Sequence, residues 1–443
     1  MSLSEERTQV ANSIPEILNL IRQDPEVYFE QLEVNFEARE SEIRAFLPEE
    51  HRFSRLRDEY RALEERYPDP EARPPLFGLP VGVKDIFHAD GFETHAGSKL
   101  PADRLAGEQA SSVTLLKDAG ALVLGKTVTT EFAYFAPGPT RNPYNTDHTP
   151  GGSSSGSAAG VAAGLAPIGF GTQTVGSINR PAAFCGVVGF KPSYARISAV
   201  GVIPLAPSLD HVGTFTSDVS GTLVAAPLLL ADWNPENLDS RLGDLAPGTV
   251  TLGIPRGPYM EGASEEAIAH LESVKLRLEA GGLRVIDVPA MTDHAEIEQR
   301  HYLILAAEAA AVHREWFDEF GEIYNPKTAE LIEKGRDIED ALVAIAIEGR
   351  GELREQLQAL MAEYRIDAWL SPAATGPAPI GIESTGDPAM NLPWTHSGLP
   401  MIGLPSGWSA NELPLGIQLT GSWYGDERLL AEAVAVERAL MEN

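Results

Sequence analysis

Two segments dominate the middle of this sequence, Gly151-Gly152-Ser153-Ser154-Ser155-Gly156 and Gly171-Thr172-Gln173-Thr174-Val175-Gly176-Ser177. No Asp, Glu, Lys or Arg occurs from His148 to Asn179, although these residues make up 22% of the chain. Glycine lets backbones approach closely, backbone amides can point at a ligand, and hydroxyls stand in place of charges. A hydroxyl nucleophile reacts best in a dry pocket lined by such donors, so the region predicts a serine-dependent active site.

The composition limits the classes of protein that the chain can belong to. It has 443 residues, 43% of them hydrophobic, and a formal net charge of −30. That charge repels phosphate backbones and anionic membranes, so we expect no nucleic-acid or membrane partner. Cys185 is the single cysteine, which excludes an intramolecular disulfide and a cysteine-based metal cluster. The polar N-terminus and the lack of a long apolar run predict a cytoplasmic protein.

The first part of the chain has the pattern of a helical arm over residues 1–72. Ile14, Ile17, Leu18 and Ile21 recur at helical spacing after Ser13, a residue type that caps helices. A proline-rich stretch ends this arm.

From residue 73 onward, short apolar runs alternate with helical patterns. Leu79–Val83 and Ala121–Leu124 are strand-like, and Leu283–Val288 follows a predicted helix that Ser264 caps. This alternation predicts an α/β protein with a mixed, twisted sheet flanked by helices on both sides. Residues 292–365 are charged and helix-forming, which predicts a helical insert inside one globular unit over 73–443.

Three local motifs suggest other chemistry. Gly120–Thr127 fits the phosphate-loop pattern GxxxxGK[ST], and this is the basis of an alternative, a nucleotide-binding protein. However, Ala121–Leu124 is itself strand-like, and a strand uses the amides that such a loop needs. Gly152–Gly156 matches GxSxG, but a loop precedes it instead of the strand that a nucleophile elbow requires. Asp210 and His211 are neighbours, so on an extended chain they point to opposite faces and cannot form an acid–base relay with each other.

Lys84 and two serines form a more specific set. Lys84 ends the apolar run 79–83, Ser153 lies in the first glycine-rich segment, and Ser177 ends the second. Other readings of these residues remain open: Lys84 could pair with a carboxylate such as Asp85, and the serines could serve turns and helix caps.

At these residues the chain resembles the amidase signature family. The resemblance covers about residues 74–232 and 366–440, and is weak in the insert. The segments that carry it are Gly82-Val83-Lys84-Asp85, 151–156, 171–177, 184–192, 208–213 and 398–421.

The resemblance implies a Ser–Ser–Lys triad with Ser177 as nucleophile, Ser153 as bridging serine on an unusual cis peptide, and Lys84 as base. It also implies that the amides of Thr174, Val175, Gly176 and Ser177 form the oxyanion hole. Gly152 and Phe132 are further candidates for substrate binding. A free lysine has a pKa of about 10.4 and is charged at neutral pH, but an apolar, uncharged environment lowers that pKa.

Three positions depart from the family pattern. Gln173 and Asn179 replace an Asp and an Arg, which suggests that two amides replace an ion pair. Val175 replaces a glycine, so a required positive φ would be strained there. Arg180 is displaced by one position, and it could clamp a substrate carboxylate or only cap local carbonyls.

The sequence therefore predicts an amidohydrolase for non-peptide C–N bonds that forms an acyl-enzyme and releases ammonia or an amine. We expect a small-molecule amide substrate and neither a metal nor an organic cofactor, and a homodimer is left open. An alternative within the family is the glutaminase-type component of a tRNA-dependent amidotransferase.

Overall fold

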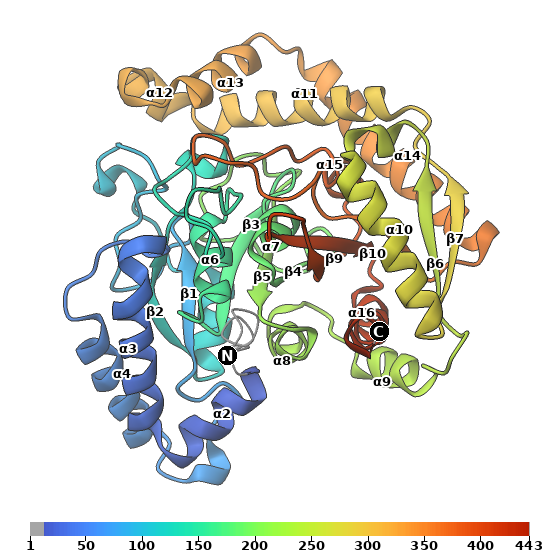
Figure 1. The fold of residues 1–443 in the computed structure, drawn as a ribbon. Coiled ribbons are helices and arrows are strands. Elements are labelled where there is room, and N and C mark those ends of the chain that lie inside the picture. Colours follow the sequence, from blue (N-terminus) through green and yellow to red (C-terminus); the bar gives the residue numbers. More distant parts are fainter. Residues whose placement is uncertain (1–12, 443) are drawn as a thin grey trace.

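The computed structural model describes residues 13–442, which build a 10-stranded mixed sheet surrounded by helices (Figure 1). At one end β1 is parallel to both of its neighbours, β2 and β3, and at the other end β6 is parallel to β7 and β8. The pairings between these two ends are antiparallel. Parallel pairs need crossover connections, which explains why strand and helix patterns alternate in those two parts of the sequence. The predicted mixed α/β architecture is confirmed. In their order across the sheet the strands are β2 (Leu122–Thr127), β1 (Pro80–Lys84), β3 (Ile168–Gln173), β5 (His211–Thr216), β4 (Val188–Lys191), β9 (Met401–Trp408), β10 (Pro414–Thr420), β8 (Ala368–Pro372), β6 (Thr251–Arg256) and β7 (Arg284–Pro289).

The helices begin and end where the sequence provides caps. Ser13 forms a capping box with Glu16 at the start of α2, and the Ser264 hydroxyl accepts the Ala267 amide at 3.2 Å at the start of α10. Both helices were predicted from these serines, and both are confirmed. The α-helices are α2 (Ile14–Gln23), α3 (Pro25–Ile43), α4 (Arg52–Arg66), α5 (Ser111–Asp118), α6 (Ser155–Ala162), α7 (Asn179–Cys185), α8 (Val219–Leu229), α9 (Pro235–Gly243), α10 (Glu265–Ala280), α11 (His294–Val312), α12 (Arg314–Phe320), α13 (Pro326–Arg336), α14 (Asp340–Tyr364), α15 (Leu392–Ser397) and α16 (Asp426–Glu442). Short 3₁₀ helices are η1 (Pro70–Ala72), η2 (Ala102–Leu105), η3 (Glu131–Ala133), η4 (Pro258–Gly262) and η5 (Gly321–Ile323).

Helices of the predicted N-terminal arm cover the open edge of β2. The Arg55 guanidinium in α4 donates hydrogen bonds to the carbonyls of Val123 and Leu124 at 3.0 and 3.1 Å. An uncovered edge strand would present these carbonyls to other chains, so the arm protects the sheet. Residues 1–12 of the predicted arm lie outside the described residues, and the division of the chain at residue 72 stays a prediction.

The segment that fits the phosphate-loop pattern is the strand β2. Its residues pair in register with β1, from Leu122 opposite Pro80 to Thr127 opposite Lys84. The strand therefore uses its amides in the sheet ladder, as expected from its apolar run, and they are not available to cradle phosphates.

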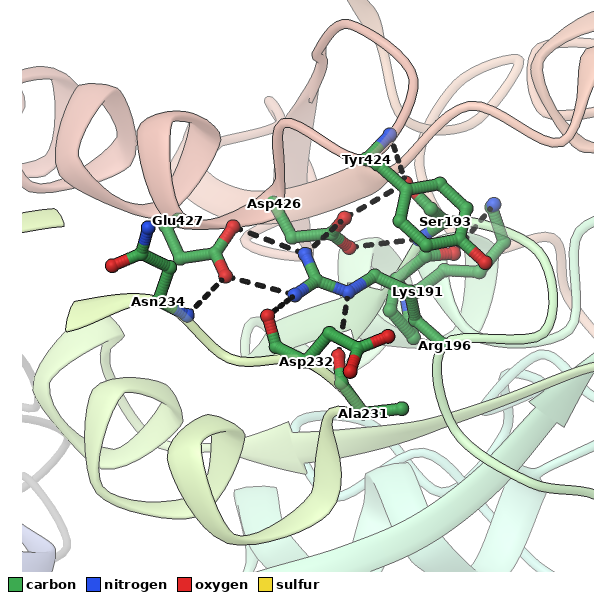
Figure 2. Close-up of polar contacts among 10 residues, drawn as sticks. Lys191, Ser193, Arg196, Ala231, Asp232, Asn234, Tyr424, Asp426 and Glu427 are labelled. Carbon is green, nitrogen blue, oxygen red and sulfur yellow. Dashed lines mark hydrogen bonds and ion pairs between the residues drawn. The ribbon is translucent and has the colours of Figure 1, made fainter. Parts of the chain in front are cut away.

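A buried ionic cluster fixes the start of α16 to the sheet (Figure 2). The Arg196 guanidinium lies between the carboxylates of Asp426 and Glu427, with N···O distances of 3.1 and 2.8 Å. Asp426 also accepts hydrogen bonds from the amide and hydroxyl of Ser193, both at 2.8 Å. Because the carboxylates of this pair of acids bind a guanidinium and further donors, their burial does not leave charges unpaired.

Residues 294–364 contain α11 to α14, in agreement with the helical character predicted for 292–365. Figure 1 shows α11, α12 and α13 together along one edge of the molecule. Across residues 13–442, none of the helices has the length and apolar character needed to cross a membrane.

Candidate active site

The glycine-rich segments serve close packing of α6 on β3. A Cβ atom at Gly171 would lie 2.9 Å from the Ser154 hydroxyl, and one at Gly169 would lie 3.0 Å from the Ser157 carbonyl. Without side chains there, the Ser157 hydroxyl reaches the Phe170 carbonyl at 2.6 Å. The start of α6 is thereby brought to the carboxyl end of β3, next to the end of the parallel strand β1.

Lys84 ends β1 at this point and is completely buried. Its ammonium nitrogen lies 2.8 Å from the Ser153 hydroxyl, 3.0 Å from the Ser154 hydroxyl and 2.8 Å from the Thr172 hydroxyl. The ion pair considered between Lys84 and Asp85 is not formed, because Asp85 binds Lys126 at 2.8 Å instead.

Burial lowers the pKa of Lys84 well below its usual value, and the charge of Asp210 opposes this shift. Three neutral hydroxyls cannot replace the solvation that the ammonium loses, so the neutral amine is favoured. The amine can then accept a proton.

Ser177 lies in the turn between β3 and α7, close to Ser153. Both serines line the same pocket, and Ser153 follows a cis peptide bond with Gly152. Among the described residues, the amides of Val175, Gly176 and Ser177 donate to no other group of the protein. Val175 does not adopt a positive φ, so its side chain causes no backbone strain of the kind considered above.

Gln173 ties this turn together without a charge. Its side-chain oxygen accepts the amides of Ile178 and Asn179 at 2.7 and 3.0 Å. Its nitrogen donates to the Thr395 hydroxyl at 2.9 Å, which in turn donates to the Val175 carbonyl at 2.6 Å.

The expected pairing of two amide side chains takes a different form. Gln173 binds the backbone of Asn179, whereas the Asn179 side chain donates to the Gly189 carbonyl at 3.4 Å. The Gln173 side chain therefore supports the backbone of the turn rather than a partner side chain.

Asp210 supports the same turn from the other side. Its carboxylate accepts the Thr174 hydroxyl at 2.6 Å and the amides of Leu205 and Ala206 at 2.9 and 3.1 Å. Burial raises the pKa of Asp210 to about 6, and these hydrogen bonds oppose the rise. His211 lies apart from this carboxylate, with its Nδ1 at 2.6 Å from the Leu209 carbonyl, so the two residues do not form a relay.

Arg180 lines the pocket that contains both serines and is almost fully buried. One terminal nitrogen, Nη2, donates to the Gly152 carbonyl at 2.6 Å and to the Thr385 hydroxyl at 3.1 Å. Its other two nitrogens, Nε and Nη1, are buried and have no hydrogen-bond partner within residues 13–442. Burial lowers the pKa of Arg180 to about 10.

Two further candidates take indirect positions. The Phe132 ring is buried against His313, Trp316 and Tyr324, while Ala133, Tyr134 and Phe135 line the pocket. Gly152 presents its carbonyl to Arg180, and a Cβ atom there would lie 2.7 Å from Thr385. Direct contact of Phe132 or Gly152 with a substrate stays a prediction.

The sequence analysis did not identify four residues of this site: Ser154, Thr172, Thr385 and Thr395. Ser154 and Thr172 lie inside the charge-free segment, where several hydroxyls were available and the register of β1 on β3 selects among them. Thr385 and Thr395 come from a distant part of the chain, and no local pattern marks them. In residues 13–442, no three His, Cys, Asp or Glu side chains are grouped so that they could hold a metal ion.

This fold and this cluster of a buried lysine with serines are those of a serine-dependent amidase. A model of the Amidase family matches residues 49–430. The chain is 33% identical over 420 residues to a Glutamyl-tRNA(Gln) amidotransferase polypeptide of Geobacter metallireducens, its A component, and the match covers 82% of this chain and 84% of that protein. The component of the same name from Thermus thermophilus is 34% identical over 416 residues, covering 82% and 85%. The protein belongs to the amidase signature family.

Solved structures agree with this assignment. A chain from a vestigial protein complex, whose structure bears on the evolutionary origins of an s-triazine catabolic enzyme, superimposes with a TM-score of 0.84 at 28% identity over 96% of this chain and 98% of that chain. A crystal structure of an amidase gives a TM-score of 0.80 at 28% identity over 99% of both chains. The peptide amidase of Stenotrophomonas maltophilia, at 23% identity, shares the fold with a TM-score of 0.82 over 98% and 97%. The predicted amidase signature fold is confirmed.

Proposed function

We propose that this protein hydrolyses non-peptide amide C–N bonds through a covalent acyl-enzyme on Ser177, with Ser153 as proton relay and Lys84 as base. The observation that carries the proposal is the buried Lys84 nitrogen, which lies among three hydroxyls, one of them Ser153 at 2.8 Å. A buried lysine that served only stability would be expected to bind a carboxylate, as Lys126 does.

In the proposed reaction, neutral Lys84 accepts a proton from Ser153 while Ser153 accepts the proton of Ser177. The Ser177 oxygen attacks the amide carbonyl, and the amides of residues 174–177 stabilise the negative oxygen that forms. When the C–N bond breaks, the proton returns through the same relay to the departing ammonia or amine. Water then attacks the ester by the same route and releases the acid.

Covalent labelling tests this proposal directly. We expect phenylmethanesulfonyl fluoride to add its sulfonyl group to Ser177, as seen by peptide mass spectrometry, and not to add it in Ser177→Ala. An unlabelled Ser177 in folded protein, together with tight binding of ATP, would favour the nucleotide-binding alternative and contradict the hydrolase.

The proposed substrate class is an amide that also carries a carboxylate. Arg180 lies in the pocket of both serines and keeps Nε and Nη1 without partners among the described residues, although Nη2 caps the Gly152 carbonyl. A guanidinium binds a carboxylate through two parallel hydrogen bonds, which would use those two nitrogens. The exposed Asp387 acts on Arg180 as a nearby negative charge, so a substrate carboxylate would compete with it.

The Arg180 assignment predicts a change in selectivity. We expect Arg180→Leu to raise the KM of acidic amides by about 10- to 100-fold while the KM of neutral amides changes little, since a charge-assisted bidentate contact is lost. An equal loss for acidic and neutral amides would show that Arg180 only supports the Gly152 carbonyl.

A second candidate function is the glutamine-hydrolysing component of a tRNA-dependent amidotransferase. The names of the curated relatives favour it. Ammonia release by the purified chain alone, measured across aliphatic, aryl, dicarboxylic and urea-type amides, separates the two. The hydrolase should act without partners, whereas activity confined to glutamine and dependent on added partner proteins would favour the amidotransferase.

A further inference from the structure

The turn Glu131–Phe135 forms one wall of the pocket that contains Ser177. Ala133, Tyr134 and Phe135 line that pocket. The residue before the turn, Thr130, donates its amide to the Ser153 carbonyl at 3.2 Å, so the wall is attached to the candidate catalytic residues.

This turn has a backbone that it cannot hold alone. Phe132 and Ala133 both adopt left-handed conformations, with φ of 47° and 60°. Residues with side chains rarely adopt such angles, and two in succession require support from surrounding structure.

The first support is a buried carboxylate at the start of α13. Glu131 accepts the Asn325 amide on both oxygens, at 3.1 and 2.9 Å, and the Thr328 hydroxyl at 2.6 Å. These donors fix the first residue of the turn to the helical insert.

The second support is an aromatic cluster. The Phe132 ring centroid lies 4.5 Å from that of His313, 6.0 Å from Trp316 and 5.3 Å from Tyr324. All three partners belong to the stretch 292–365, so the side chain that would be expected in the pocket is instead held by the insert.

The third support joins two walls of the pocket. The ammonium of Lys327, on α13, donates to the Phe135 carbonyl at 3.2 Å and to the Glu383 carbonyl at 3.1 Å. Glu383 comes two residues before Thr385, which binds Arg180 from the other side of the pocket. Lys327 therefore bridges the chain segments on both sides of Arg180.

We propose that α13 sets the width of the acyl pocket by holding the 131–135 turn, and that Lys327 is a specificity-determining residue that acts through position. Lys327 does not contact the candidate catalytic residues. The inference rests on the proposed function, because the pocket is taken to receive the acyl group of an amide.

The test uses two reagents of different size on the same serine. We measure rate constants for labelling of Ser177 by phenylmethanesulfonyl fluoride and by the small methanesulfonyl fluoride. In Lys327→Met the ratio of the large to the small reagent should rise about fivefold, because the walls lose two charge-assisted hydrogen bonds. Lys334→Met is the matched control: it removes a lysine of the same helix that pairs with the exposed Glu330, and its ratio should equal that of the wild type.

Hydrogen exchange provides a readout that does not depend on the chemistry. The amides of Phe132, Ala133 and Tyr134 are hydrogen-bonded, so Lys327→Met should accelerate their exchange and Lys334→Met should not. An unchanged labelling ratio in Lys327→Met, or unchanged exchange, would overturn the proposal. Wild-type protein whose Ser177 reacts with neither reagent, but whose turn exchanges faster in Lys327→Met, would refute the hydrolase and leave the support of the wall standing.

Discussion

Two buried lysines lie at the ends of adjacent parallel strands and differ in their partners. Lys84 ends β1, and Lys126 lies in β2 opposite Val83. Lys126 binds the Asp85 carboxylate at 2.8 Å, whereas Lys84 lies among the hydroxyls of Ser153, Ser154 and Thr172.

The comparison separates the effect of burial from the effect of a counter-charge. Burial is the largest cause of a lowered pKa in both lysines. For Lys126 the adjacent Asp85 offsets it, while for Lys84 the opposing charge is Asp210, whose carboxylate is hydrogen-bonded to Thr174 and not to the ammonium. A neighbouring carboxylate thus preserves a lysine as a structural cation, and its absence yields an amine that can act as a base.

The largest expected effect is on catalysis. Lys84→Met should lower the rate of Ser177 acylation by about 10³- to 10⁴-fold, because the relay loses its base. The rate is measured with a chromogenic amide or with the sulfonyl fluoride. A Lys84→Met protein that keeps more than about a tenth of the activity would contradict the assignment of Lys84.

The next effect concerns stability and should appear at the other lysine. Lys126→Met should lower the free energy of unfolding by about 3 kcal/mol or more, since it leaves the buried Asp85 carboxylate without its partner. The double variant Asp85→Asn/Lys126→Met should recover part of this loss in urea titrations. If Lys126→Met proved as stable as the wild type, the ion pair would not be a structural element.

A smaller effect should distinguish the hydroxyls around the two lysines. Thr172→Val removes one hydroxyl from Lys84 and should reduce kcat about 10-fold with little change in KM. Thr94→Val removes the hydroxyl that lies 2.9 Å from Lys126, and kcat should remain as in the wild type. Equal losses of kcat in both variants would mean that the two lysine environments are not functionally different.

The smallest effect is a gain of stability at Lys84 that depends on pH. Since its pKa is lowered in the folded state, the unfolded chain binds a proton that the folded protein does not, and folding carries a penalty below the unfolded pKa of about 10.4. Lys84→Met removes this penalty and should raise the free energy of unfolding near neutral pH by about 1 kcal/mol. The gain should shrink as the pH rises toward about 10.4, and a gain that is constant with pH would contradict a neutral Lys84.

Much of the fold could be predicted from local sequence. Ser13 and Ser264 marked the starts of α2 and α10, and the apolar runs around Val81 and Val123 marked β1 and β2, because caps and hydrophobic periodicity are local properties. The order of ten strands and the change from parallel to antiparallel pairing were not predictable in this way, since they depend on contacts between distant segments.

The candidate site divides along the same line. The charge-free segment and the positions of Lys84, Ser153 and Ser177 were available from the residues and the family resemblance. The partners of these residues were not: Thr395 supports the nucleophile turn from 222 residues away, and Thr385 contacts Arg180 from 205 residues away.

The sequence by itself determined that hydroxyls, glycines and one lysine would meet in a region without other charges, because residue type and strand pattern are written locally. Only the tertiary structure decided that Asp85 would turn to Lys126 and leave Lys84 among hydroxyls. It also decided that Phe132 would be held by the insert instead of facing the pocket. The physical reason is that a partner is chosen by strand register and side-chain direction across the fold, and neither can be read from neighbours in the chain.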